Sequence, residues 1–240
     1  MTSKLFGEFM GTMVLILMGN GAVANMLLKR SKAEGAGWVA ITAGWAFAVM
    51  TGVFTAIACG SPDAHLNPAV TLGFAVKTGD FSLLAPFAVA QLLGAMVGAV
   101  LVWLNFLPHW AVTPDPEVKF ACFGTSPAID SRGSNLVTEG LGAFILILVV
   151  SAIGSKATGT LPPGLGPYLV GMLVWAIGLS LGGTTGYAIN PVRDLGPRIM
   201  HAILPIPEKR AANWSYAPVP VIGPLVGGAV AGLLARVVGF

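Results

Sequence analysis

The chain has 240 residues, of which 55% are hydrophobic and only 10% are charged, and its formal net charge is +3. Soluble domains carry about 25% charged residues, so this composition argues against a protein whose main solvent is water. The few basic residues mostly edge long apolar runs, so the net charge does not indicate a nucleic-acid partner. We therefore expect an integral membrane protein.

Six apolar runs are long enough to cross a bilayer, for which about 20 helical residues suffice. The first run is too long and too weakly flanked by basic residues for a cleavable signal peptide, so we expect it to remain as a span. These runs predict an all-α membrane protein. Because their number is even, both termini should lie on the same side of the membrane. The runs are residues 5–28, 38–59, 81–106, 135–155, 161–189 and 214–235.

The distribution of Lys and Arg does not fix the orientation of these spans. Cytoplasmic loops normally carry the excess of basic residues. With the N-terminus inside, however, the other nine basic residues fall outside and only four fall on the cytoplasmic side, namely Lys4, Lys77, Lys156 and Arg236. Charge alone therefore does not support cytoplasmic termini.

The two halves of the chain look duplicated. Gly-Glu-Phe-Met-Gly at 7–11 opens the first run, Thr-Glu-Gly-Leu-Gly at 138–142 opens the fourth, and each half contains a short segment that begins with Asn-Pro. Three spans per half mean that the second half enters the membrane from the opposite side. We expect one transmembrane domain over 1–240, with inverted repeats at about 1–110 and 132–240. A proline-rich linker outside the membrane joins them. Short segments at matching places of inverted halves indicate a permeation or binding site near the bilayer midplane.

Each Asn-Pro pair predicts the start of a helix, because Asn is a favoured N-cap and Pro suits the first turn. The apolar stretch after Asn67 ends at Val76, so this helix should enter the membrane and stop partway, and the helix after Asn190 is similarly short. Two half-helices entering from opposite faces would bring their positive N-terminal ends together, which disfavours cations. The loops before them must be non-helical, and such backbone is tolerated at that depth only against protein or a hydrated path. These loops are residues 60–66 and 182–189.

A few ionisable residues lie in or beside the predicted spans. Arg193 is expensive in lipid and is expected to face an aqueous lumen, where its fixed donors could bind a hydroxyl or water and its charge could repel cations. An ion pair with Asp194 is the alternative role. Glu8 and Glu139 are each the only charge in their run, and we expect each to accept hydrogen bonds from loop N–H groups. A proton relay is the alternative for the two carboxylates.

The stretches 64–71 (AHLNPAVT) and 188–198 (AINPVRDLGPR) resemble the paired motifs of the major intrinsic protein family, in its glycerol uptake facilitator or aquaglyceroporin branch. The similarity runs from 7–12 to 223–227, nearly the whole chain. It implies an aquaporin-like fold with six transmembrane helices, two re-entrant half-helices and a homotetramer with one pore per subunit. It also implies a multi-pass protein of the plasma membrane with cytoplasmic termini, against the charge count.

The function that the resemblance implies is a passive channel and not an enzyme. Glycerol, other small neutral solutes and water would cross the bilayer, ions and protons would not, and no cofactor or metal would be needed. Carried over by position, the outer constriction falls on Trp45, Gly178, Tyr187 and Arg193, and the midplane motifs fall on Asn67, Pro68, Ala69, Asn190, Pro191 and Val192. The pore-lining carbonyls fall on Ala64, His65, Gly186, Tyr187 and Ala188, and the structural carboxylates are Glu8, Glu139 and Asp194.

The chemistry of these positions fits glycerol, which has carbons on one edge and hydroxyls on the other. Trp45 and Tyr187 would form an apolar wall opposite Arg193 and the carbonyls. Glycine at 178 leaves width that water-selective relatives fill with histidine. Three features depart from the pattern of the branch: Val192 replaces the usual alanine, Tyr187 replaces a frequent phenylalanine, and the loop at 60–63 looks longer. Each could shift the preferred solute.

Three other functions remain as alternatives. A water-selective channel of the same fold needs a bulky side chain at position 178. A secondary transporter needs a titrating carboxylate beside its substrate, for which Glu8 and Glu139 are the candidates. An intramembrane enzyme needs a nucleophile with a base or a metal cluster, whereas the histidines are scattered at 65, 109 and 201 and the two cysteines, 59 and 122, have no metal-binding spacing.

Overall fold

The computed structural model describes residues 3–240, and in this range the regular secondary structure is helical. Five helices are long and apolar enough to cross a membrane, and α8 (Leu165–Leu181) is a shorter apolar helix of 17 residues. At 1.5 Å per residue α8 rises about 25 Å, near the lower limit for a span. The expected all-α membrane fold is thus confirmed. The five longer helices are α1 (Lys4–Leu27), α2 (Gly37–Ala58), α4 (Leu84–Asn105), α7 (Arg132–Ile153) and α10 (Pro218–Val238).

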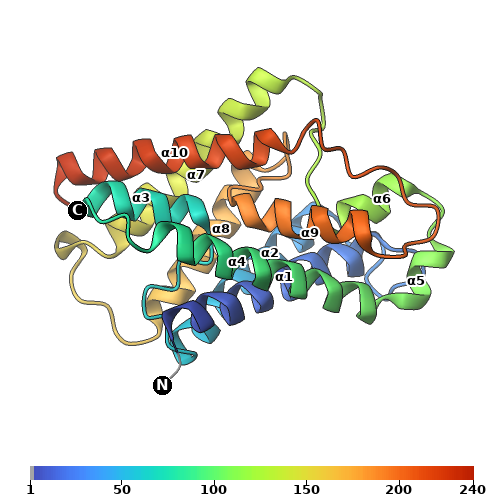
Figure 1. Cartoon of the computed structure of the whole chain (residues 1–240), viewed down its shortest axis with the longest axis horizontal. Coiled ribbons are helices and arrows are strands. Elements are labelled where there is room, and N and C mark those ends of the chain that lie inside the picture. Colours follow the sequence, from blue (N-terminus) through green and yellow to red (C-terminus); the bar gives the residue numbers. More distant parts are fainter. Residues whose placement is uncertain (1–2) are drawn as a thin grey trace.

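The two half-helices are α3 (Pro68–Thr78) and α9 (Pro191–Ile203), and they enter the bundle from opposite ends with their first turns facing each other (Figure 1). Their lengths of about 16 and 20 Å are roughly half of a bilayer's hydrocarbon thickness. Asn67 caps α3 by accepting a hydrogen bond of 2.9 Å from the backbone N–H of Ala69. Asn190 caps α9 by accepting from the N–H of Val192 at 3.1 Å.

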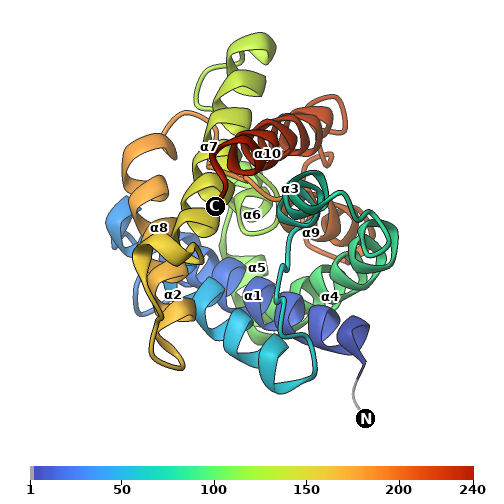
Figure 2. The same cartoon turned by 90° about the vertical axis from the view of Figure 1, so that its left-hand side faces the viewer.

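Each half-helix packs on a long helix of the other half of the chain: α3 lies against α10, and α9 lies against α4. In Figure 2, α3 stands in front of α9, between α10 and α4. Glycine allows this close approach, because a Cβ on Gly232 of α10 would collide with the carbonyl oxygen of Gly73 in α3. The two halves therefore interlock around the half-helices.

The linker between the halves folds onto one end of the bundle. It contains the short helices α5 (Leu107–Val112) and α6 (Pro116–Ala121), which lie at the end opposite to the chain termini in Figure 1. Trp110 and Phe123 are buried within it, and the side-chain amide of Asn20 in α1 donates to the carbonyl of Phe123. The linker thus forms a packed cap on this end of the bundle.

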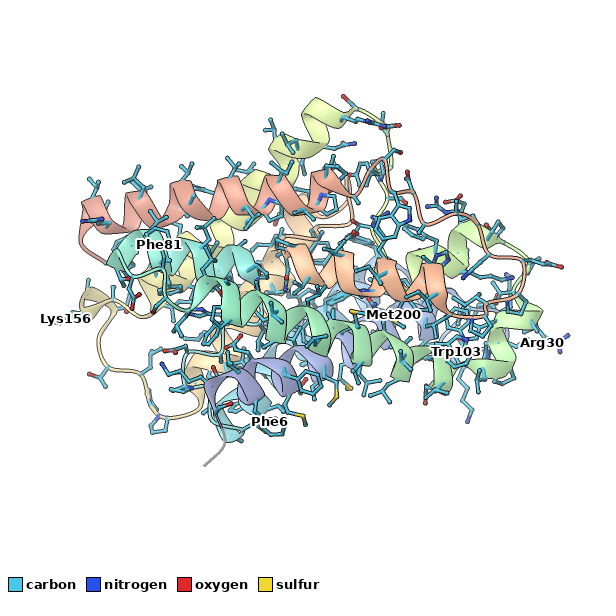
Figure 3. All side chains as sticks on the ribbon, viewed as in Figure 1. Phe6, Arg30, Phe81, Trp103, Lys156 and Met200 are labelled. Atoms are coloured by element: carbon cyan, nitrogen blue, oxygen red, sulfur yellow. The ribbon has the colours of Figure 1, made fainter. Side chains whose placement is uncertain are left out.

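The loops divide between the two ends of the bundle. Figure 3 places Phe6, Phe81 and Lys156 towards the end where both termini lie, and Arg30 and Trp103 towards the opposite end. Both termini lie at the same end because the five longer helices and α8 together make an even number of passes through the bundle. Within the fifth apolar run, 161–189, the helix α8 ends at Leu181, and the backbone from there to the cap of α9 is irregular, as expected for the loop 182–189.

Candidate pore and its constriction

A cavity of about 310 Å³ runs beside the two half-helices. At one end it is bordered by Pro62 and Asp63, which precede α3, and at the other it reaches Arg193 in α9. Asn67 and Asn190 line its middle, and much of the remaining wall is aliphatic or aromatic. The cavity therefore passes the point where the two half-helices meet.

The two asparagine side chains bond across this meeting point. The amide nitrogen of Asn67 donates to the carbonyl of Ile189, and that of Asn190 donates to the carbonyl of Leu66, both at 2.8 Å. A carboxamide has two N–H groups, so each asparagine keeps one donor for the cavity. The other motif residues are buried in the first turns of the half-helices and do not line the cavity; these are Pro68, Ala69, Pro191 and Val192.

Glu8 of α1 is fully buried and holds the loop that leads to α3. One carboxylate oxygen accepts from the hydroxyl of Ser61 at 2.7 Å and from the backbone N–H of His65 at 2.9 Å. The other accepts from the backbone N–H of Leu66 and from the side chain of Gln91, both at 2.7 Å. All four contacts go to donors, as suits an ionised carboxylate, which can only accept.

Glu139 of α7 makes the matching contacts with the loop that leads to α9. One oxygen accepts from the hydroxyl of Thr185 at 2.6 Å and from the N–H of Ala188 at 3.0 Å, and the other accepts from the N–H of Ile189 at 2.7 Å. The side chain is buried as completely as that of Glu8. In both halves, a buried glutamate therefore holds the loop by accepting hydrogen bonds from two successive backbone N–H groups.

These contacts fix the direction of the loop carbonyls. In a planar trans peptide the C=O points opposite to the N–H of the next residue. Because the N–H groups of two successive residues point at each glutamate, the carbonyls of Ala64 and His65, and those of Tyr187 and Ala188, point away from it. All four of these residues line the cavity, whereas Gly186 does not.

The loops achieve this geometry with left-handed residues three and one positions before each asparagine. A non-glycine residue in that conformation costs about 1–3 kcal/mol and persists only where its surroundings impose it. Here the buried glutamates supply the compensating hydrogen bonds. The residues are Ala64 (φ +43°), Leu66 (φ +52°), Tyr187 (φ +36°) and Ile189 (φ +44°).

Three of the four expected constriction residues meet at one end of the cavity. The guanidinium carbon of Arg193 lies 4.1 Å from the centroid of the Trp45 ring, and Tyr187 lines the same region. Gly178 does not line the cavity, because a Cβ there would lie 2.9 Å from Cζ of Tyr187 and from Cγ2 of Thr42. The space beside Gly178 is thus filled by the tip of the Tyr187 ring.

Asp194 pairs with Arg198 and not with Arg193. The guanidinium of Arg198 donates to the two carboxylate oxygens at 2.6 and 2.9 Å, and both side chains are fully buried. Asp194 also accepts from the N–H and the hydroxyl of Thr125 in the linker, both at 2.7 Å. The alternative of an Arg193–Asp194 pair is therefore wrong. The i,i+4 spacing of Asp194 and Arg198 is the sequence signal that could have revealed their pairing.

Comparisons with known proteins match this architecture. A family model described as "Major intrinsic protein" matches residues 1–235. The chain is 51% identical over 235 residues to a glycerol uptake facilitator protein of Streptococcus pneumoniae, covering 98% of both chains. It is 51% identical over 227 residues to a probable glycerol uptake facilitator protein of Thermotoga maritima, covering 94% of this chain and 95% of the relative.

A solved structure agrees with these sequence relatives. The X-ray structure of the aquaglyceroporin from Plasmodium falciparum superposes with a TM-score of 0.85 at 29% identity, covering 98% of this chain and 96% of that one. The family model and the relatives cover nearly the whole length, including both half-helices and the two glutamates. The chain therefore belongs to the major intrinsic protein family.

Proposed function

We propose that the chain is a passive channel through which glycerol, other small uncharged solutes and water diffuse across the membrane, while ions and protons are excluded. The observation that carries this proposal is the cavity beside the half-helices, whose lining combines aliphatic and aromatic side chains with the asparagines Asn67 and Asn190 and residues of the two loops. Glycerol as solute is supported by the relatives, which are named glycerol uptake facilitators and are about half identical over nearly their whole length.

The polar side of the cavity replaces the water that a small polyol loses on entry. The carbonyls of the two loops can accept hydrogen bonds from hydroxyls, and the free N–H groups of Asn67 and Asn190 can donate to them. Arg193 adds further donors and lies over the ring of Trp45, and the apolar atoms of that ring in the cavity wall would meet the carbon edge of the solute. A neutral solute needs only these exchanges, whereas a cation would also lose hydration energy and would meet the positive charge of Arg193 in the cavity lining.

Cations and protons should be excluded at two places. The two half-helix N-termini each carry about half a positive charge, and the guanidinium of Arg193 stays charged. In reconstituted vesicles we expect glycerol flux that does not saturate and does not respond to an ion gradient. A proton or sodium current comparable in size with the glycerol flux would contradict this proposal.

Glu8 and Glu139 are proposed to hold the loops and not to move protons. In Glu8→Gln and Glu139→Gln, the amide NH₂ faces donors that the carboxylate satisfied, and we expect a loss of about 1–3 kcal/mol in stability. The measurement is the thermal unfolding midpoint and the folded yield in detergent, with the glycerol-to-water permeability ratio measured on the folded fraction. Relative to wild type, the glycerol-to-water permeability ratio should change by a smaller factor than the folded yield.

The matched control is Glu34→Gln, since Glu34 is also paired, at 2.7 Å with Lys29, but lies exposed in a loop. Exposed pairs contribute about 0–1 kcal/mol, so this variant should behave like wild type. If Glu8→Gln or Glu139→Gln folded normally but lost flux, or if wild-type flux followed a proton gradient, the transporter alternative would replace the channel.

A water-selective channel is the second candidate, and one observation favours it: the Tyr187 ring occupies the space beside Gly178 that would otherwise widen the constriction. The two candidates differ in the ratio of glycerol to water permeability of the wild-type protein. Fast water flux with negligible glycerol flux would favour the water channel.

We further propose that the channel is a single domain of two inverted repeats, about 1–110 and 132–240, that assembles as a homotetramer in the plasma membrane with cytoplasmic termini. The exposed apolar faces of α2, α7 and α8 suit either lipid or a neighbouring subunit. They carry Phe47 and Phe54, Val137 and Leu141, and Leu179. Mass measurement of the complex in a lipid nanodisc tests the subunit number.

A further inference from the structure

The ring of Tyr187, which lines the cavity, packs against a socket formed by three residues that do not line it. These residues are Trp38, Gly178 and Gly182, and we call the site the Tyr187 socket. Trp38 lies in the first turn of α2, and its ring is 5.8 Å from that of Tyr187, at an interplanar angle of 77°. Its indole Nε1–H donates to the carbonyl of Gly178 at 3.1 Å. Trp38 is 39% exposed and does not line the cavity.

The two glycines of the socket leave room for the tyrosine ring. They are one helical turn apart at the end of α8, and a Cβ on Gly182 would lie 2.5 Å from Cδ1 of Tyr187 and 2.9 Å from Cζ2 of Trp38. The carbonyl of Gly178 is one of the last four of α8, which have no partner within the helix. Trp38 supplies that partner and so ties the start of α2 to the end of α8 beside the constriction.

Packing alone holds the Tyr187 ring in place. Its hydroxyl is buried and finds no hydrogen-bond partner within residues 3–240, and its backbone is in the left-handed region at φ +36°. Within residues 3–240, no hydrogen bond therefore holds the tip of the ring. The position of the ring is set by what fills the socket behind it.

We infer that Trp38 is a positioning residue for solute selection: by filling the socket, its indole sets how far the Tyr187 ring projects into the cavity. This inference rests on the proposed channel function and adds a residue that determines the width of its constriction. Removing the indole leaves space into which the ring can retreat, so the constriction widens. The wider path admits larger polyols, while water, which needs little width, is affected least.

The test is Trp38→Ala, with the permeability of glycerol, of a five-carbon polyol and of water measured in vesicles. We expect the ratio of five-carbon polyol to glycerol permeability to rise about tenfold, the discrimination that a change of about one methylene in a site provides. Trp38→Phe keeps an aromatic edge but lacks the Nε1–H, and it should raise the ratio by less. This milder variant decides the question if the alanine variant does not fold.

Two controls separate positioning from a general structural effect. Trp214→Ala removes a tryptophan that is similarly exposed, at 49%, but lies in the turn before α10 and away from the cavity lining; it should leave the ratio unchanged. In a Tyr187→Leu background, Trp38→Ala should no longer change the ratio, because residues that act through one another are non-additive.

A folded Trp38→Ala variant with the wild-type polyol ratio would overturn the inference, and so would an undiminished effect of Trp38→Ala in the Tyr187→Leu background. These outcomes are distinct from failure of the proposed function. If the wild-type protein passed water but no glycerol, glycerol would be wrong as its solute, and the inference would then require Trp38→Ala to gain glycerol flux.

Discussion

Gly178→His should lower glycerol permeability at least about tenfold, a change of about 1.4 kcal/mol in the barrier, while water permeability falls much less. The reason is that even the Cβ of a new side chain would lie 2.9 Å from Cζ and 3.0 Å from the hydroxyl of Tyr187. The substitution must therefore push the Tyr187 ring towards the cavity or distort α8. A swelling assay on reconstituted vesicles, with glycerol and with an impermeant osmolyte, gives both permeabilities.

The control for this substitution lies in the same region of the chain. A Cβ on Gly183 would meet no atom within 4 Å, so Gly183→His adds the same side chain without displacing Tyr187 and should conduct glycerol like wild type. Unchanged glycerol flux through a folded Gly178→His protein would place the solute filter elsewhere. Equal losses in the two variants would show that the effect of histidine is not steric.

Arg198→Met should destabilise the folded protein by about 3–5 kcal/mol, the loss typical of breaking a buried ion pair from one side. The guanidinium of Arg198 bonds the carboxylate of Asp194 and the carbonyls of Thr125, Ala212 and Asn213 at 2.6–2.9 Å. Its removal leaves the buried carboxylate of Asp194 without its positively charged partner and removes the bond from Arg198 to the linker carbonyl of Thr125, while the two bonds from Thr125 to Asp194 remain. The thermal unfolding midpoint in detergent measures the loss.

Arg236→Met is the matched control, because Arg236 is exposed in the last turn of α10 and such changes are usually within about 0.5 kcal/mol. The double variant Asp194→Asn, Arg198→Met should be less destabilised than the sum of the single variants, since the two side chains interact directly. If Arg198→Met were as stable as Arg236→Met, the buried contacts of Arg198 would not contribute to the stability of the fold.

The sequence predicted the half-helices well because capping is a local property. Asn67 and Asn190 cap α3 and α9 through contacts with N–H groups two residues ahead, and such contacts depend only on neighbouring residues. The apolar run 161–189 did not by itself show where α8 ends, and that end followed only from the expected non-helical loop at 182–189. The stretch after Leu181 is apolar enough to extend the hydropathy signal, but tertiary contacts, including those with Glu139, hold it in an irregular conformation.

The surroundings of the constriction could not be predicted from spacing. Trp38 and Gly178 are 140 positions apart in the chain, so no local pattern indicates that they touch. The sequence also gives no sign that the space beside Gly178 is filled by Tyr187, because the direction of a ring in a left-handed loop residue depends on what packs behind it. The fold class follows from composition and the lengths of the apolar runs, whereas the width of the path depends on such contacts.

The interlocking of the halves has a consequence for biosynthesis. The chain is synthesised from its N-terminus, and α3 is finished when residue 78 has been made. The helix on which α3 packs, α10, begins only at residue 218. While the intervening residues are translated, α3 lacks α10. The first half-helix can therefore complete its packing only after the last helix has been made. A ribosome that stalls before codon 218 leaves a nascent chain in which α3 can contact α4 and α7 but lacks α10, its main packing partner.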